Sequence, residues 1–258
     1  VLNNSVGIAG LAQVQIMSEK VLDSGGYGYW DWVANGITHA VDQGANIISM
    51  SLGGYGDSQL VHDAVKYAYD AGVLVIAAAG NDNTNTKSYP AGYDEVIAVA
   101  ATDQTDNKAY FSNWGDWIEL SAPGVSIYST MPTYYVTLNN YGYAMNYDYL
   151  SGTSMACPHV AGLAALLWSL YPQKTKDWFR LWLRFTAGDL GESGFDVYYG
   201  YGRINARKTI ERTPPEHELI AYEWTTPPYV KPETVGTVNA TVLNFGENNE
   251  TDVTVQLL

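Results

Sequence analysis

A serine that could act as a nucleophile, Ser154, follows a glycine turn and opens an apolar helical pattern. Gly152 permits backbone angles that a β-carbon would forbid. Apolar residues then recur at helical spacing, at Val160, Leu163, Leu166, Leu167 and Leu170. A hydroxyl at a helix start lies at the positive end of the helix dipole, and the N–H of the same residue would face a developing oxyanion. The pattern indicates acyl-transfer chemistry, and a serine N-cap is the plain alternative.

A serine hydroxyl needs an adjacent base, and none of the four histidines is expected to supply one. His159 lies on the same predicted helix as Ser154, at a spacing that points it away. His39 and His62 lie on amphipathic helical patterns and are expected to face solvent. His217 lies beyond a Pro-Pro linker. The base must therefore be sought elsewhere.

Residues 151–162 read Ser-Gly-Thr-Ser-Met-Ala-Cys-Pro-His-Val-Ala-Gly, which resembles the nucleophile motif of the subtilisin-like serine proteases. Four further segments resemble other motifs of that family and occur in the family's order: 51–54, 77–81, 121–125 and 200–206. Together they cover roughly residues 1–212. The resemblance implies a serine endopeptidase that cleaves polypeptides through an acyl-enzyme.

The resemblance also implies roles for individual residues. Ser154 would be the nucleophile and Asn81 the oxyanion-hole donor, although Asn-Asp-Asn after a glycine is also an ordinary turn sequence. A substrate strand would pair with the backbone of 51–54, where a strand ending in a glycine turn is the alternative. The residues implied in substrate binding are Ser51, Leu52, Gly53, Gly54, Ala78, Ala79, Gly80 and Thr153.

The family's Asp-Ser/Thr-Gly and His-Gly-Thr-His motifs do not occur in a usable place. Asp23 begins an Asp-Ser-Gly string, but it follows Lys-Val-Leu, which resembles a family segment beyond the catalytic histidine. The sequence is therefore expected to lack the N-terminal part with both catalytic partners, and to be inactive alone. A non-catalytic subtilase-fold protein that binds peptides or partners remains the alternative, which upstream motifs would decide. A nucleophile-elbow hydrolase is excluded because Gly-x-Ser-x-Gly is absent around Ser154.

Residues 2–8 resemble the family's calcium loop. By that resemblance the carbonyls of Leu2, Val6 and Ile8 and the amide oxygen of Asn4 would bind Ca²⁺, a hard cation that prefers oxygen ligands. The family's Asp and Gln ligands are not matched, so the structural calcium site is expected to be weakened. Without the resemblance, this string is simply a turn.

The chain carries 27 acidic and 13 basic residues, for a net charge of −14. This balance argues against a nucleic-acid or anionic-membrane partner. Cys157 is the only cysteine, so an internal disulfide is excluded and a small buried side chain is expected. No signal peptide is visible, and the apolar run 160–170 is too short to span a bilayer. The resemblance nevertheless implies an extracellular enzyme, with a propeptide possible in the full-length protein.

Strand and helix patterns alternate, with strands expected at 14–22, 46–52, 73–79 and 96–101 and helices at 31–43 and 60–71. This rhythm predicts an α/β fold: a parallel sheet with helices on both faces, in three layers as in subtilisins. Ligands of such sheets lie beyond the carboxyl ends of the strands, where 51–54 and 80–81 fall.

A Thr-Pro-Pro string at 213–215 separates a peptidase domain, 1–212, from a short β segment, 213–258. Strands are expected at 219–224, 236–244 and 251–258, with a turn at 246–249. The segment resembles the opening strands of an immunoglobulin-like β-sandwich related to cell adhesion. It is too short for a whole sandwich, so an incomplete module, and further such modules in the full-length protein, are expected.

Overall fold

The computed structural model describes residues 5–225, 239–248 and 251. The chain divides into two compact units, Val1–Thr209 and Ile210–Leu258, and each is described by itself.

The first unit is built on a four-stranded parallel sheet in the order β1-β2-β3-β4. Its strands are Ile47–Met50 (β1), Leu74–Ala78 (β2), Val96–Thr102 (β3) and Leu120–Pro123 (β4). Every residue of β2 and β3 is buried, as expected for strands that are covered on both faces. The apolar runs in the sequence therefore fix both strands in the centre of the sheet.

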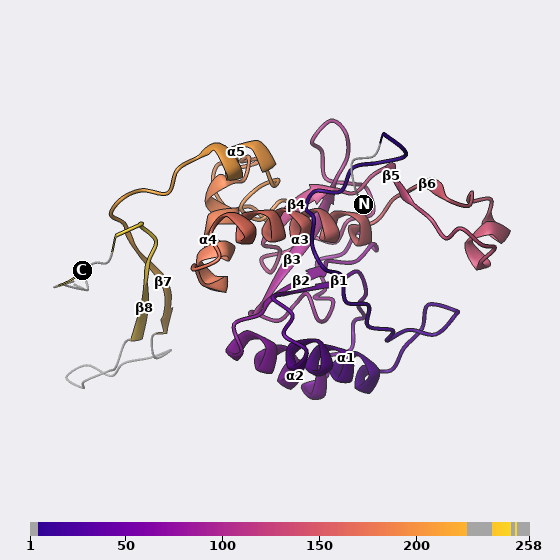
Figure 1. Ribbon diagram of the computed structural model, residues 1–258, viewed down its shortest axis with the longest axis horizontal. Helices are drawn as coiled ribbons and strands as arrows, with labels where there is room; N and C mark the ends of the chain where they lie inside the picture. Colours follow the sequence, from indigo (N-terminus) through magenta and orange to yellow (C-terminus); the bar gives the residue numbers. More distant parts are fainter. Residues whose placement is uncertain (1–4, 226–238, 249–250, 252–258) are drawn as a thin grey trace. The chain divides into compact units, whose positions relative to one another are not determined.

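Helices cover the two faces of this sheet (Figure 1). Trp30–Asp42 (α1) and Gln59–Asp70 (α2) pack against each other on one face, and their core includes alternate residues of β2, among them Val75 and Ala77. Thr153–Leu170 (α3) lies on the other face and contacts all four strands. Lys176–Thr186 (α4) packs on α3, and Ala206–Glu211 (α5) follows.

The predicted α/β fold with a parallel sheet is confirmed in its four strands and their helices. The helices expected at 31–43 and 60–71 lie within one residue of α1 and α2. The expected strand at 14–22 is wrong, because these residues pair with no described strand. They are held by side chains instead: Val21 lies against Gly36 of α1, and Glu19 pairs with His39 of α1 at 2.8 Å.

The sequence reading missed the antiparallel hairpin of Ile127–Thr130 (β5) and Tyr147–Leu150 (β6) and the 3-10 helix at Thr137–Tyr141 (η1). It also missed α4, whose N-cap Thr175 accepts a hydrogen bond from the N–H of Trp178.

Helix α3 is longer than the apolar run 160–170 suggested. Over Thr153–Leu170 it is long and apolar enough to cross a membrane by length and composition alone. Its contacts with all four strands are those of a core helix. Buried core helices are often as long and as apolar as membrane-spanning ones, so the length and composition of α3 are only weak evidence for a membrane span.

The second unit contains Leu219–Thr225 (β7) and Asn239–Asn244 (β8), paired antiparallel with a register shift between Ala221 and Glu223. These strands correspond to the ones expected at 219–224 and 236–244. The third expected strand, 251–258, lies outside the described residues apart from Thr251, which is in no strand. The domain boundary at 212 and the β-sandwich assignment therefore stay predictions.

Candidate active site

Ser154 lies in the first turn of α3, where backbone N–H groups have no intrahelical acceptor. The turn before it is fixed by a hydrogen bond of 2.8 Å from the N–H of Gly152 to the carbonyl of Gly124, beyond the end of β4. Ser51, just past the end of β1, donates its hydroxyl to the carbonyl of Ser154 at 2.8 Å. In return, the Ser154 hydroxyl lies 3.4 Å from the carbonyl oxygen of Ser51. The nucleophile candidate is thus fixed at the carboxyl edge of the sheet.

Asn81 follows β2 at the same edge and is oriented by Thr153. The Oδ1 atom of Asn81 accepts hydrogen bonds from the backbone N–H of Thr153 at 2.8 Å and from its hydroxyl at 3.0 Å. The Thr153 hydroxyl in turn accepts from the N–H of Gly80 at 3.0 Å. Because its oxygen accepts these hydrogen bonds, Asn81 directs its Nδ2 group toward Gly152. A β-carbon built on Gly152 would lie 3.5 Å from this nitrogen. An amide donor beside the nucleophile turn is the arrangement that stabilises an oxyanion.

A residue that the sequence reading missed, Asn113, holds the Asn81 loop. Its fully buried side chain donates to the carbonyl of Ala79 at 2.9 Å and to the Tyr55 hydroxyl at 3.2 Å. It accepts from the backbone N–H groups of Asp82 at 2.9 Å and Thr84 at 3.3 Å. A β-carbon at Gly80, whose φ is +104°, would collide with this side chain, so the position requires glycine. In the sequence, Asn113 is marked only by its place in a short polar stretch between two aromatic residues, Phe111 and Trp114. This pattern is too common to identify Asn113 as a residue that supports the site.

The segment 51–54 runs beside 88–90. Gly54 and Tyr89 exchange two backbone hydrogen bonds, of 2.9 and 2.7 Å. A β-carbon at Gly53 would lie 2.9 Å from the Tyr89 carbonyl, so this close approach requires glycine. Ser51 is exposed, Leu52 is half-buried, and Ala78 and Ala79 are buried beneath the site. Thr153 is also fully buried, and its contacts are with the Asn81 loop.

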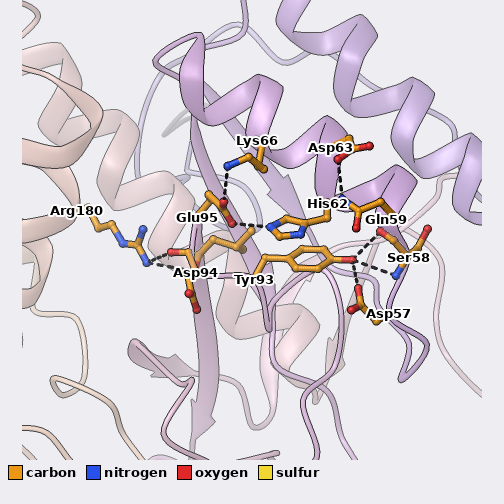
Figure 2. Close-up of polar contacts among 11 residues, drawn as sticks. Asp57, Ser58, Gln59, His62, Asp63, Lys66, Tyr93, Asp94, Glu95 and Arg180 are labelled. Carbon is orange, nitrogen blue, oxygen red and sulfur yellow. Dashed lines mark hydrogen bonds and ion pairs between the residues drawn. The ribbon is translucent and has the colours of Figure 1, made fainter. Parts of the chain in front are cut away.

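A cluster around Tyr93 fixes the chain that follows 51–54 (Figure 2). The Tyr93 hydroxyl donates to Asp57 at 2.9 Å and receives the N–H of Ser58 at 3.2 Å. Burial raises the pKa of Tyr93 to about 12, and the hydrogen bond to Asp57 acts in the same direction, so the hydroxyl keeps its proton. His62 stacks on the Tyr93 ring at 4.2 Å and bonds Glu95 at 3.1 Å.

The remaining histidines also have hydrogen-bond partners other than Ser154. His159 bonds the carbonyl of Met155, one helical turn earlier, at 2.8 Å. His39 pairs with Glu19, and His217 bonds Asn248. Across the residues that the structure describes, no histidine hydrogen bonds to Ser154.

Asp23 and Cys157 have structural surroundings. The Asp23 carboxylate accepts the N–H groups of Gly25 and Tyr27 within a turn, and those bonds lower its pKa. Cys157 lies on α3 and is fully buried against the sheet, with its sulfur 3.7 Å from the carbonyls of Met50 and Ile76, and burial raises its pKa to about 11. Its thiol therefore stays neutral and is not a competing nucleophile.

The calcium-loop residues are described in part. Leu2 and Asn4 lie outside the described residues. Val6 and Ile8 flank Gly7, which has a φ of +68°, and Ser5 has a φ of +65°. The chain therefore turns tightly between the two predicted carbonyl ligands.

Comparison with known proteins identifies the family. The sequence model of the Subtilase family matches residues 1–202. The chain belongs to the subtilase family of serine endopeptidases.

Individual relatives agree with this. Thermitase of Thermoactinomyces vulgaris is 46% identical over 212 residues, which cover 82% of this chain and 71% of thermitase. Subtilisin DY of Bacillus licheniformis is 44% identical over 215 residues, covering 81% of this chain and 73% of that protein. The predicted serine endopeptidase function, exerted on polypeptides, is confirmed at the level of the family.

Solved structures are similar in fold. A lanthipeptide protease superposes with a TM-score of 0.68 at 29% identity, over 74% of this chain and 68% of that one. A psychrophilic subtilisin-like protease from the Antarctic psychrotroph Pseudoalteromonas sp. AS-11 superposes with a TM-score of 0.65 at 25% identity, over 74% and 75% of the two chains.

Proposed function

We propose that Ser154 is the nucleophile of this subtilase and that Asn81 and the Ser154 N–H hold the oxyanion. The observation that carries the proposal is the double hydrogen bond from Thr153 to the Asn81 oxygen, since it turns the Asn81 amide toward the nucleophile turn. Charge develops on the substrate oxygen only in the tetrahedral state, so donors placed there favour the transition state.

The peptide substrate would lie as an added strand along 51–54. Strand addition supplies main-chain hydrogen bonds, and pockets for alternate side chains supply specificity. Leu52 and the segment 78–80 would form the walls of those pockets, and Thr153 would support them from beneath.

In the described part of the chain, none of the four histidines hydrogen bonds to Ser154, so none is placed as its base. We expect the 258-residue chain by itself to turn over peptides negligibly. Oxyanion stabilisation and binding alone leave only residual catalysis. The family's catalytic Asp and His motifs are needed to complete the site.

The calcium and module assignments are also proposals. The carbonyls of Leu2, Val6 and Ile8 with the Asn4 amide form an all-oxygen set suited to Ca²⁺, with weak affinity because the family's side-chain partners are unmatched. An extracellular location, a propeptide and a β-sandwich module beginning near residue 213 follow from the family resemblance.

The test is covalent labelling with a serine-directed phosphonate, with the chain alone and after it is combined with a segment that carries the two family motifs. We expect turnover of a chromogenic peptide, and an adduct on Ser154 by mass spectrometry, only in the combined protein. Ser154→Ala should abolish both, and Ser169→Ala, on the same helix, should change neither. An adduct elsewhere, or activity in Ser154→Ala, would contradict the assignment.

The alternative is a subtilase-fold protein that binds peptides without cleaving them. It would be favoured if the combined protein bound peptide substrates but formed no adduct.

A further inference from the structure

The hairpin of β5 and β6 is joined directly to the nucleophile turn. β6 ends at Leu150, four residues before Ser154. The N–H of Ser126, just before β5, donates to the Ser151 hydroxyl at 2.9 Å. Figure 1 shows the hairpin extending away from the four-stranded sheet, with η1 at its far end. The base of the hairpin is thus part of the candidate site. The rest of the hairpin extends away from the sheet, where a ligand could contact it.

One face of the hairpin carries three tyrosines. Tyr128 and Tyr149 are direct cross-strand partners, so their side chains lie on one face, and Tyr147 lies on the same face two residues away. The Tyr128 ring centroid is 4.8 Å from that of Tyr149 and 5.8 Å from that of Tyr147. Tyr128 and Tyr149 are 41% and 57% exposed. We call these three residues the tyrosine face.

The tyrosine face is fixed in place. The Tyr147 ring lies where a β-carbon of Gly7 would be, so it rests on the N-terminal loop. Antiparallel pairing from Ile127↔Leu150 to Thr130↔Tyr147 holds the two strands in register. Because the rings are ordered in advance, a ligand would not have to pay for their immobilisation.

The charge around the tyrosine face favours a cationic ligand. Residues 109–173 contain no lysine or arginine, and the whole chain has a net charge of −14. Asp148 lies between Tyr147 and Tyr149 on β6, so its side chain is on the opposite face of the hairpin. Its carboxylate accepts the N–H groups of Ala144 and Tyr149, which lower its pKa, so it adds negative charge to the hairpin without lying on the tyrosine face itself.

Other aromatic rings of this protein already bind its own cations. The Lys176 ammonium lies 3.3 Å from the centroid of Tyr69, and the Arg184 guanidinium 4.7 Å from that of Tyr201. Within the described part of the chain, no cation lies over a ring of the tyrosine face in this way.

We propose that the tyrosine face is a docking surface for lysine- or arginine-containing segments of the polypeptide substrate. The proposal rests on the proposed function, since it assumes that the reacting bond lies at Ser154. A cation over a tyrosine ring is attracted by the electrons of the ring face. Tyr147 and Tyr149 are two residues apart, so at roughly 3.3 Å per residue the face extends about 7 Å along β6, a length that about three extended substrate residues span.

Peptide binding to the Ser154→Ala protein tests this without any need for turnover. The probes are fluorescein-labelled peptides of about twelve residues, long enough to reach the face, that differ only in carrying Lys, Gln or Glu at the same positions. We expect anisotropy to show the Lys peptide bound most tightly. The double variant Tyr128→Leu/Tyr149→Leu should weaken its binding about 5- to 30-fold, the equivalent of one ring–cation contact at each site.

Two controls separate the ring faces from other causes. Tyr128→Phe/Tyr149→Phe keeps the aromatic faces and should retain most of the affinity. Tyr110→Leu removes a tyrosine that is 84% exposed but lies outside the hairpin, and should change nothing. Circular dichroism and the thermal transition verify that each variant is folded.

Equal binding of the Lys, Gln and Glu peptides would overturn the proposal, as would unchanged binding in the Leu double variant or no binding of the Lys peptide at millimolar concentration. Loss of affinity in the Phe variant would assign the binding to the hydroxyls and also overturn it. The phosphonate experiment on Ser154 is independent of these outcomes, so failure of the proposed function is distinguishable.

Discussion

At the scale of single residues, the buried amide of Asn113 joins three segments that are distant in the sequence. It bonds Tyr55 after β1, the carbonyl of Ala79 after β2, and the loop N–H groups of Asp82 and Thr84. All the hydrogen-bonding groups of its side chain are used. The position of Asn81 therefore depends on a residue that itself has no place in the chemistry.

Asn113→Ala should lower the free energy of unfolding by about 1–3 kcal/mol, because the buried Ala79 carbonyl loses its side-chain donor. Asn85→Ala, at an exposed position in the same loop region, serves as the control and should stay within about 0.5 kcal/mol of the parent. Urea unfolding followed by circular dichroism measures both. Equal stabilities of the two variants would contradict the role given to Asn113.

Cys157 should be unreactive toward thiol reagents at pH 8 while the protein is folded. Its pKa is raised to about 11, mainly by burial, so little thiolate is present, and the packing of α3 on the sheet leaves the thiol with no exposed surface. Reaction with a chromogenic disulfide should proceed only after denaturant is added. Rapid labelling of the native protein would show that the packing of α3 on the sheet does not protect the thiol.

The residues that meet at the site could be predicted from sequence where short motifs mark the ends of strands. Asn81 directly follows Gly80, and Ser51 and Ser154 each lie two residues from a glycine, Gly53 and Gly152. Ser51 and Asn81 follow predicted parallel strands, and the carboxyl ends of such strands meet at one edge of the sheet. Asn113 could not be predicted, because its partners are separated from it by 29 to 58 residues and nothing local marks the contact.

At the scale of elements, hydrophobic patterning identified those that bury apolar residues at a regular period. α1, α2 and the strands β1 to β3 were found for this reason. Residues 14–22 are also partly apolar, but in the described part of the chain they pair with no strand, and pairing is a long-range property that no local pattern contains. Tyr128 and Tyr149 are exposed and no residue of β5 or β6 is fully buried, so these strands gave no burial period to recognise.

Helix α4 is fixed to the sheet by a buried ion cluster. Glu119, just before β4, bonds Arg180 at 2.5 Å and Arg184 at 2.7 Å, and both arginines lie on α4. Burial raises the pKa of Glu119, but the two guanidinium charges outweigh burial and lower the pKa overall. The carboxylate is therefore ionised in the folded protein at neutral pH.

Glu119→Gln should lower the free energy of unfolding at pH 7 by about 3–5 kcal/mol, because it leaves the buried Arg180 and the partly buried Arg184 without their anion. Since the folded-state pKa is depressed, the stabilisation by Glu119 is complete above its unfolded pKa of about 4.3 and is lost as the pH falls through the folded value. The parent and Glu119→Gln should thus converge in stability below about pH 4. Urea unfolding across this range, with the exposed Glu192→Gln as control, tests the claim. A constant difference down to pH 3 would contradict it.

At the scale of the whole molecule, the acidic balance and the exposed apolar surface have opposite effects on solubility. A net charge of −14 keeps molecules apart at low ionic strength. Salt screens that repulsion, with a Debye length of about 10 Å at 0.1 M. Contacts between exposed apolar groups then decide whether the protein associates.

The segment 14–17 is the place where we expect such association to begin. Val14, Ile16 and Met17 are 52%, 84% and 43% exposed, and in the described part of the chain their segment pairs with no strand. An extended apolar segment with unpaired backbone groups is a template for pairing with another chain. We expect the parent to associate in 0.5 M salt, and Ile16→Lys should increase the monomer fraction there and leave the thermal transition in place. Tyr110→Lys, at a position that is also 84% exposed, is the matched control and should not reduce association. Light scattering and size-exclusion chromatography measure both, and equal association of the two variants would place the cause outside this segment.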